Sequence, residues 1–201
     1  MTLPRRCTSI VILSACFALG CAIGVQARSA RARAGARSDK AAAEAGPALI
    51  DLAGYQQMVA SYHGKALMVT FWATWCEPCR DEYPMIVDLA KKYAPQGLAV
   101  VGVSLDENSD VNLVHQFLAQ ARPDFPNYRQ KSGIDVNAFY HGVNPAWHGT
   151  MPQTIFYGRD GHIARYLIGA SPQMAFENAI RLILIKSAAE NGKTISTAVG
   201  E

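Results

Sequence analysis

The sequence predicts an α/β domain in which helices flank a central mixed sheet. Two nearly uninterrupted apolar runs, residues 66–72 and 98–105, have the composition of parallel strands that are covered on both faces. Each run is followed by an amphipathic segment with the period of a helix. Near the end, Asp160-Gly161 separates two shorter runs and is a strong turn signal for an antiparallel hairpin. Strands of both directions therefore belong to one sheet.

The expected elements follow from local signals along the chain. The first helix after a buried strand spans 77–93, has an apolar stripe on one side and is expected to bend at Pro84. Its stripe consists of Tyr83, Ile86, Val87, Leu89 and Ala90. The other expected elements are a short strand at 49–52, a helical turn at 56–61, a helix capped by Asn108 or Ser109 and ending near Ala121, a brief pairing at 127–129, a helical turn at 136–140, and hairpin strands at 153–157 and 162–168.

The last helix is expected to start at Ser171-Pro172 and to end near Ala189. Its predicted inward residues are Met174, Ala175, Ala179, Leu182 and Ile183. The folded part has about 150 residues, which suits one domain with one core. We divide the chain into an N-terminal leader at 1–27, a basic Ala/Arg-rich linker at 28–46, the domain at 47–190 and a disordered tail at 191–201.

The leader predicts export. Arg5 and Arg6 precede an apolar stretch at 10–25, which is typical of a signal peptide cleaved after Ala27. Two alternatives stay open: the stretch is an uncleaved membrane anchor, or residues 13–16 form a lipoprotein box. All three place the domain in a periplasmic or other extracytoplasmic space, and the two alternatives tether it to a membrane.

The charge balance argues against a nucleic-acid partner. The net charge is +3, but without the two leader arginines the chain has 17 basic and 16 acidic residues. Most of the remaining surplus lies in the linker, so the domain carries no large basic surface of the kind that binds phosphate backbones.

Cys76 and Cys79 have the spacing of a dithiol–disulfide exchange centre. They follow a buried strand and begin a helix, where free backbone N–H groups and the helix dipole lower the pKa of a thiol. The other cysteines, Cys7, Cys16 and Cys21, lie in the leader. We therefore assign Cys76 as the nucleophile and Cys79 as the cysteine that resolves a mixed disulfide.

The neighbours of the cysteines suggest further roles. Trp75 offers an apolar face to a client peptide, and Glu77 and Pro78 lie between the sulfurs and tune them. A carboxylate near a thiolate raises the thiol pKa and favours a reductant, although Glu77 could equally serve only the first helical turn.

A metal site and a pair of structural thiols are the alternatives for these cysteines. A Cys₂His₂ site would need two of His141, His148 and His162, whose positions in the sequence lack ligand spacing. We predict no metal and no cofactor other than the redox-active disulfide.

Residues 71–84, Phe-Trp-Ala-Thr-Trp-Cys-Glu-Pro-Cys-Arg-Asp-Glu-Tyr-Pro, together with the order of elements, resemble the thioredoxin superfamily. Within it the chain is most similar to TlpA/ResA-like extracytoplasmic reductases, which include thiol reductants of cytochrome c maturation. The resemblance covers about residues 49–189 and implies a thioredoxin fold. It also implies a cis bond before Pro152, which would pack on the disulfide, and a client-binding backbone at Met151.

Two departures from this family limit what the resemblance implies. Thr70 stands where thioredoxins proper carry a buried acid, so proton movement must use another group. Asp106 and Glu107 are the nearest acidic candidates, but solvated loop positions are the favoured interpretation for both. The segment 144–151 is longer than expected, and Trp147 and His148 could shape or gate the substrate groove.

The sequence thus predicts an exported thiol–disulfide oxidoreductase that reduces protein disulfides. Its partners would be disulfide-bearing client proteins and a membrane thiol reductant that supplies electrons. A disulfide-donating oxidase or isomerase is one alternative, and a non-catalytic metal or haem carrier is another. A peroxidase would need a cysteine in a different loop, and outside the leader the chain has only Cys76 and Cys79.

Overall fold

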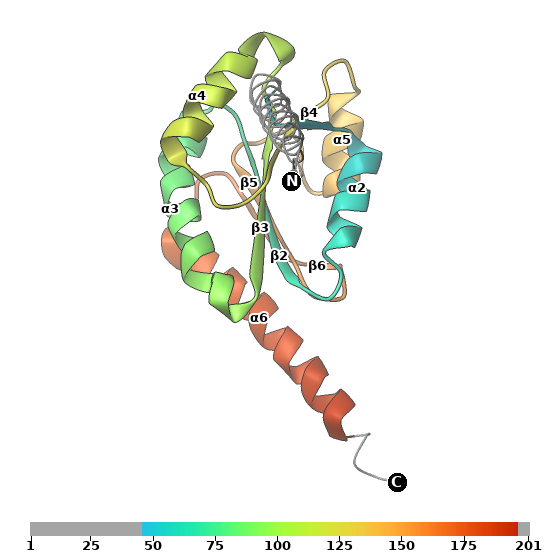
Figure 1. Ribbon diagram of the computed structural model, residues 1–201. Coiled ribbons are helices and arrows are strands. Elements are labelled where there is room, and N and C mark those ends of the chain that lie inside the picture. Colours follow the sequence, from blue (N-terminus) through green and yellow to red (C-terminus); the bar gives the residue numbers. More distant parts are fainter. Residues whose placement is uncertain (1–45, 197–201) are drawn as a thin grey trace, which may run out of the picture. The chain divides into compact units, whose positions relative to one another are not determined.

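The computed structural model describes residues 46–196, with side chains to residue 185 (Figure 1). The strands are β1 (Ala48–Ile50), β2 (Ala66–Trp72), β3 (Leu98–Ser104), β4 (Asn127–Gln130), β5 (Gln153–Tyr157) and β6 (Ile163–Ile168). The helices are α2 (Leu52–Ser61), α3 (Glu77–Tyr93), α4 (Val111–Ala121), α5 (Val136–Val143) and α6 (Gln173–Ser196), with 3₁₀ helices at Ala94–Gln96 and Asn108–Asp110.

The six strands form one mixed sheet in the order β1-β4-β3-β2-β5-β6. The first four strands in this order are parallel to one another, whereas β5 pairs antiparallel with both β2 and β6. All seven residues of β2 are buried because strands flank it on both edges and helices cover both faces. This arrangement confirms the predicted mixed sheet and hairpin.

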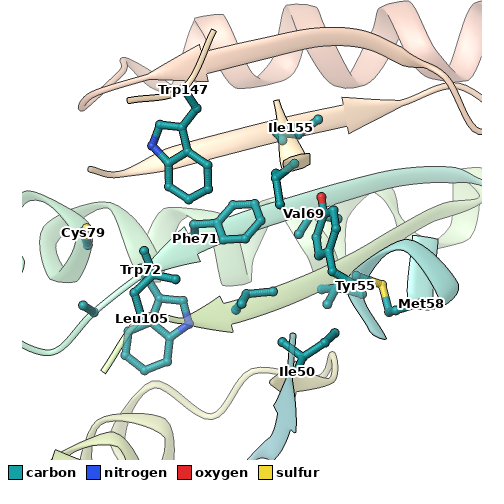
Figure 2. Close-up of a cluster of buried hydrophobic side chains, with 14 of the residues drawn as sticks. Ile50, Tyr55, Met58, Val69, Phe71, Trp72, Cys79, Leu105, Trp147 and Ile155 are labelled. Carbon is teal, nitrogen blue, oxygen red and sulfur yellow. The ribbon is translucent and has the colours of Figure 1, made fainter. Parts of the chain in front are cut away.

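The helices divide between the two faces of the sheet (Figure 1). On one face Tyr55 and Met58 of α2 pack against the side of β2 that carries Val69 and Phe71 (Figure 2). Phe139 of α5 joins this cluster, with its ring centroid 6.3 Å from that of Phe71. The other face packs against α3 and α6, and its buried residues include Met68, Ile86, Leu89, Phe156 and Ile180. Leu67 and Val69 thus belong to one cluster and Ala66 and Met68 to the other, as the pleat of a strand requires.

Helix α3 and strand β2 have the predicted bounds, and all five residues of the predicted α3 stripe are buried. Other bounds differ slightly. The first strand ends at Ile50, because Asp51 caps α2 by accepting a hydrogen bond from the N–H of Gly54 at 2.9 Å. Neither Asn108 nor Ser109 caps α4, since both lie in the 3₁₀ helix that leads into it.

The inward face of α6 was predicted only in part. Ala179 and Ile183 are buried, but Met174 and Leu182 are 70% and 37% exposed. The buried stripe instead contains Phe176, Ala179, Ile180 and Ile183, spaced i, i+3, i+4 and i+7. The helix also continues to Ser196, through residues 191–196 where a tail without regular structure was expected.

The predicted leader at 1–27 lies outside the described residues, as does the linker up to residue 45. Among residues 46–196, no helix has both the length and the apolar character needed to span a membrane.

We expect Ile180→Ala to lower the free energy of unfolding by about 2–5 kcal/mol, because the fully buried side chain would leave a cavity between α6 and the sheet. Leu182→Ala is the matched control on the same helix and should cost less than about 1 kcal/mol, since Leu182 is 37% exposed. Urea unfolding of the oxidised protein measures both, and a larger loss for Leu182→Ala would contradict the observed helix face.

Candidate active site

Cys76 and Cys79 form a disulfide at the start of α3, directly after the buried strand β2. Cys76 is the N-cap residue in an extended conformation, and its Sγ accepts a hydrogen bond from the N–H of Cys79 at 3.3 Å. Both cysteines are largely buried, with 6% of Cys76 and 2% of Cys79 exposed. The position offers a thiolate on Cys76 a backbone donor and the positive end of a 17-residue helix.

The residues around the cysteines differ in exposure. Trp75 is 61% exposed and is therefore accessible beside the sulfurs. Glu77 and Pro78, the first two residues of α3, are also exposed. Their predicted effect on the sulfurs stays a prediction.

Asp106 is buried, which corrects the favoured interpretation that it is solvated. It follows β3, is 1% exposed, and both of its carboxylate oxygens accept the backbone N–H of Thr74 at 3.1 Å. The hydroxyl of Thr74 donates to the same carboxylate, as does the hydroxyl of Ser104 at 2.6 Å. Glu107 is exposed as expected.

The Asp106 carboxylate thus fixes the loop that leads from β2 to Cys76. Thr74 is held from the other side as well, because the guanidinium of Arg80 donates to its carbonyl oxygen. The main-chain carbonyl of Asp106 in turn accepts a hydrogen bond from the buried Arg129 at 3.3 Å. These contacts make Asp106 a positioning residue for the loop, because its carboxylate is engaged with Thr74 and Ser104.

Glu82 is a buried acidic residue of α3 that the sequence analysis missed. It lies three residues after Cys79 on the buried side of α3 and is 7% exposed. Burial raises the pKa of its carboxyl to about 7, although a hydrogen bond from the N–H of Ser171 at 3.1 Å opposes this shift. The sequence does contain a signal for this burial. Glu82 follows Cys79 by three residues and so shares the helix face that carries the apolar stripe.

The segment before β5 contains the expected cis bond between Met151 and Pro152. Pro152 is buried and Met151 is half-buried. Thr70 is also buried, as expected for the position of the missing acid, and its hydroxyl accepts a hydrogen bond from that of Thr154 at 3.3 Å.

Trp147 does not line a client groove, which corrects the prediction for the 144–151 segment. Its side chain is fully buried, with its ring 4.7 Å from that of Phe71 and 4.4 Å from that of Tyr140, measured between centroids (Figure 2). Its Nε1–H donates to the carbonyl of Thr150 at 2.8 Å. Trp147 therefore fixes the 144–151 segment by packing its side chain into the hydrophobic core.

The neighbouring His148 is exposed and pairs with His141 of α5, with 3.0 Å between Nδ1 and Nε2. The fold thus joins two histidines that the sequence separates by seven positions. No group of three or more potential metal-ligating side chains occurs within the described part of the chain.

A mixed sheet with helices on both faces, a redox disulfide at the start of α3 and a cis-proline before β5 together define a thioredoxin-fold protein. The model of the AhpC/TSA family matches residues 39–166, so the chain belongs to the AhpC/TSA family.

Relatives within this fold carry related names. The chain is 38% identical over 53% of its length to "Thiol-disulfide oxidoreductase ResA" of Oceanobacillus iheyensis, and the match spans about half, 51%, of that relative. The Bacillus subtilis protein of the same name is 26% identical over 67% of this chain and 70% of its own. A crystal structure of a "thiol:disulfide interchange protein" from Chlorobium tepidum has a TM-score of 0.54 at 25% identity, covering 62% of this chain and 83% of that one.

We expect Asp106→Ala to lower the free energy of unfolding by about 1–3 kcal/mol, because the N–H and hydroxyl of Thr74 would lose their acceptor. Glu107→Ala is the adjacent control and should change it by less than about 0.5 kcal/mol. Chemical denaturation of the oxidised proteins provides the comparison, and equal effects would show that the Asp106 contacts do not hold the loop.

Glu82 predicts a specific pH dependence of stability. Because the pKa of its carboxyl rises from an ordinary value of 4.5 to about 7 in the folded state, folding favours the protonated form. The resulting stability is present below pH 4.5 and is lost as the pH rises through about 7. We expect the Tm of the oxidised protein to fall by about 2–4 °C more between pH 5 and pH 8 in the wild type than in Glu82→Gln. Asp81→Asn, at an exposed neighbouring position, should keep the wild-type pH dependence.

Proposed function

We propose that this protein is an exported thiol–disulfide oxidoreductase that reduces disulfides of client proteins. The observation that carries the proposal is the position of Cys76, which caps α3 and accepts the N–H of Cys79 at its sulfur. The names of the relatives, a thiol-disulfide oxidoreductase and a thiol:disulfide interchange protein, support the reaction class. Export rests on the leader, which lies outside the described residues.

In the reaction, the thiolate of Cys76 attacks one sulfur of the client disulfide, whose S–S bond breaks as the second client sulfur leaves as a thiolate. The thiolate of Cys79 then attacks the Sγ of Cys76 in the mixed disulfide. The remaining client sulfur leaves, and the Cys76–Cys79 disulfide forms. The client gains two electrons and the protein loses two, so a membrane thiol reductant must return them.

Cys79 must lose its proton before it attacks, and Glu82 is suited to accept it. Glu82 and Cys79 are three residues apart on α3, and both are buried. A pKa of about 7 leaves part of the population unprotonated at neutral pH. The buried Thr70 cannot serve this purpose because its hydroxyl does not ionise in this range.

We propose that the protein acts in the reducing direction. Glu77 lies in the first turn of α3, where a negative charge opposes formation of the Cys76 thiolate and so favours the disulfide form. The resemblance to the TlpA/ResA-like reductases suggests a task in cytochrome c maturation. The alternatives are an oxidase or isomerase with the same cysteines and a metal or haem carrier.

We expect the reduced protein to reduce a protein disulfide with a stoichiometry of two electrons. Cys79→Ser should stop at a mixed disulfide on Cys76, because the resolving thiol is gone, and Cys76→Ser should form no such adduct. Mass spectrometry of non-reduced samples identifies the adduct. A persistent adduct on Cys79 in the Cys76→Ser variant, with none in Cys79→Ser, would reverse the two roles.

The equilibrium potential of the couple decides the direction. A reductant should lie near about −270 mV and an oxidase near about −120 mV. Stoichiometric metal in the reduced protein that is lost in Cys76→Ser would instead support a carrier.

A further inference from the structure

We propose that a groove between α3 and α4 binds an acidic segment of the client protein beside its disulfide, an inference that rests on the proposed function. This α3–α4 groove encloses about 600 Å³ and is formed by residues of α3, from Arg80 to Lys91, and by the end of α4 with Arg122. The two helices lie side by side on one edge of the domain (Figure 1). A volume of this size is typical of binding sites.

The charges around the groove favour a negative occupant. Of its nine described lining residues, Arg80, Lys91 and Arg122 are basic and only Asp88 is acidic. Lys91 also lies 4.0 Å from the carboxylate of Asp124, but both side chains are more than half exposed, so this pair contributes little. The groove therefore keeps a positive rim.

The floor of the groove is apolar. Val87 is buried, and Phe117 is half-buried with its ring 4.7 Å from that of Trp72. An occupant that places an aliphatic or aromatic side chain on this floor and carboxylates at the rim would match both features. A peptide with alternating acidic and apolar residues meets that requirement.

The backbone conformation of Arg122 is a second feature that points to this groove. It ends α4 with φ 46°, and it is the only non-glycine residue with a positive φ in the described part of the chain. Glycine is favoured at such helix ends because it has no Cβ to clash. An arginine there lowers stability, and this arginine is one of the residues that line the groove. Backbone conformations of this rare kind cluster at binding sites.

The groove is continuous with the reactive cysteines. The N–H of Arg80 donates to the carbonyl of Cys76 at 3.1 Å, and its guanidinium contacts the carbonyl of Thr74 in the active-site loop. From Arg80 to Lys91 the helix rises about 16 Å, the length of about five extended residues. A client segment that flanks the target disulfide can therefore follow α3 while its sulfur meets Cys76.

The test uses three peptides with the same disulfide and a five-residue flank built from Leu with Glu, Gln or Lys. We expect the reduced full-length protein to reduce the Glu peptide about tenfold faster than the Gln peptide at low ionic strength, and the Lys peptide more slowly than both. Stopped-flow fluorescence gives the second-order rate constants. The preference should decrease with added salt.

Variants assign the preference to the groove. Arg122→Glu should abolish the Glu/Gln rate ratio. Arg165→Glu should leave it unchanged, because it makes the same charge change at an exposed position on β6. Arg122→Gly should reduce the ratio while raising the Tm by about 2–4 °C, since glycine relieves the positive φ. This opposite effect on binding and stability separates a binding role from a structural one.

An unchanged ratio in Arg122→Glu, or an equal loss in Arg165→Glu, would overturn the proposal. Binding of a labelled acidic peptide without cysteine to the oxidised protein tests the groove separately from the chemistry. If this peptide binds and Arg122→Glu abolishes binding, but no disulfide peptide is reduced, the proposed function fails and the groove remains. If all peptides are reduced at equal rates, the groove fails and the reductase remains.

Discussion

The site depends on one constraint: the burial of β2 fixes the point at which α3 begins. All seven residues of β2 are buried, and the strand pairs on both edges, so its register cannot slip without moving apolar side chains into water. The chain leaves the sheet at Trp72, and only three residues separate it from Cys76. The cysteine is thereby held at the helix start, where its sulfur accepts the N–H of Cys79 and faces the positive end of the helix dipole.

Three carboxyl groups near this junction have different roles because their surroundings differ. Asp106 is enclosed by hydrogen-bond donors and holds the loop. Glu82 is buried with a single backbone donor, and burial raises its pKa to about 7. Glu77 is exposed, and its proposed role is to tune the sulfurs through its charge. The same functional group is thus fixed by several donors at Asp106 and raised in pKa by burial at Glu82, and these surroundings motivate the different roles proposed for the three carboxyls.

The sequence predicted the features that local patterns determine. The bounds of β2 and α3, and the placement of Cys76 and Cys79 at a helix start, follow from apolar runs and the cysteine spacing. The burial of Asp106 depends on Thr74, 32 positions away, and no local pattern contains that contact. In α6, residue hydrophobicity alone suggested Met174 and Leu182, whereas the packing of Phe176 on Phe156 sets the buried face.

Because Trp147 is buried, it is not part of the surface that a client protein could contact. An aromatic residue in a polar segment beside the site suggests a contact with ligand, but its ring fills the core between Phe71 and Tyr140. With Trp147 inside, the exposed residues next to the cysteines in the sequence include Trp75, Glu77 and Pro78. Trp75 is uncharged and can pack against many apolar side chains. In a client complex it would add buried contact area without distinguishing one client from another. In the proposed complex, selection among clients would come from charged groups, and the basic rim of the α3–α4 groove includes Arg80, which contacts the active-site loop at the carbonyl of Thr74.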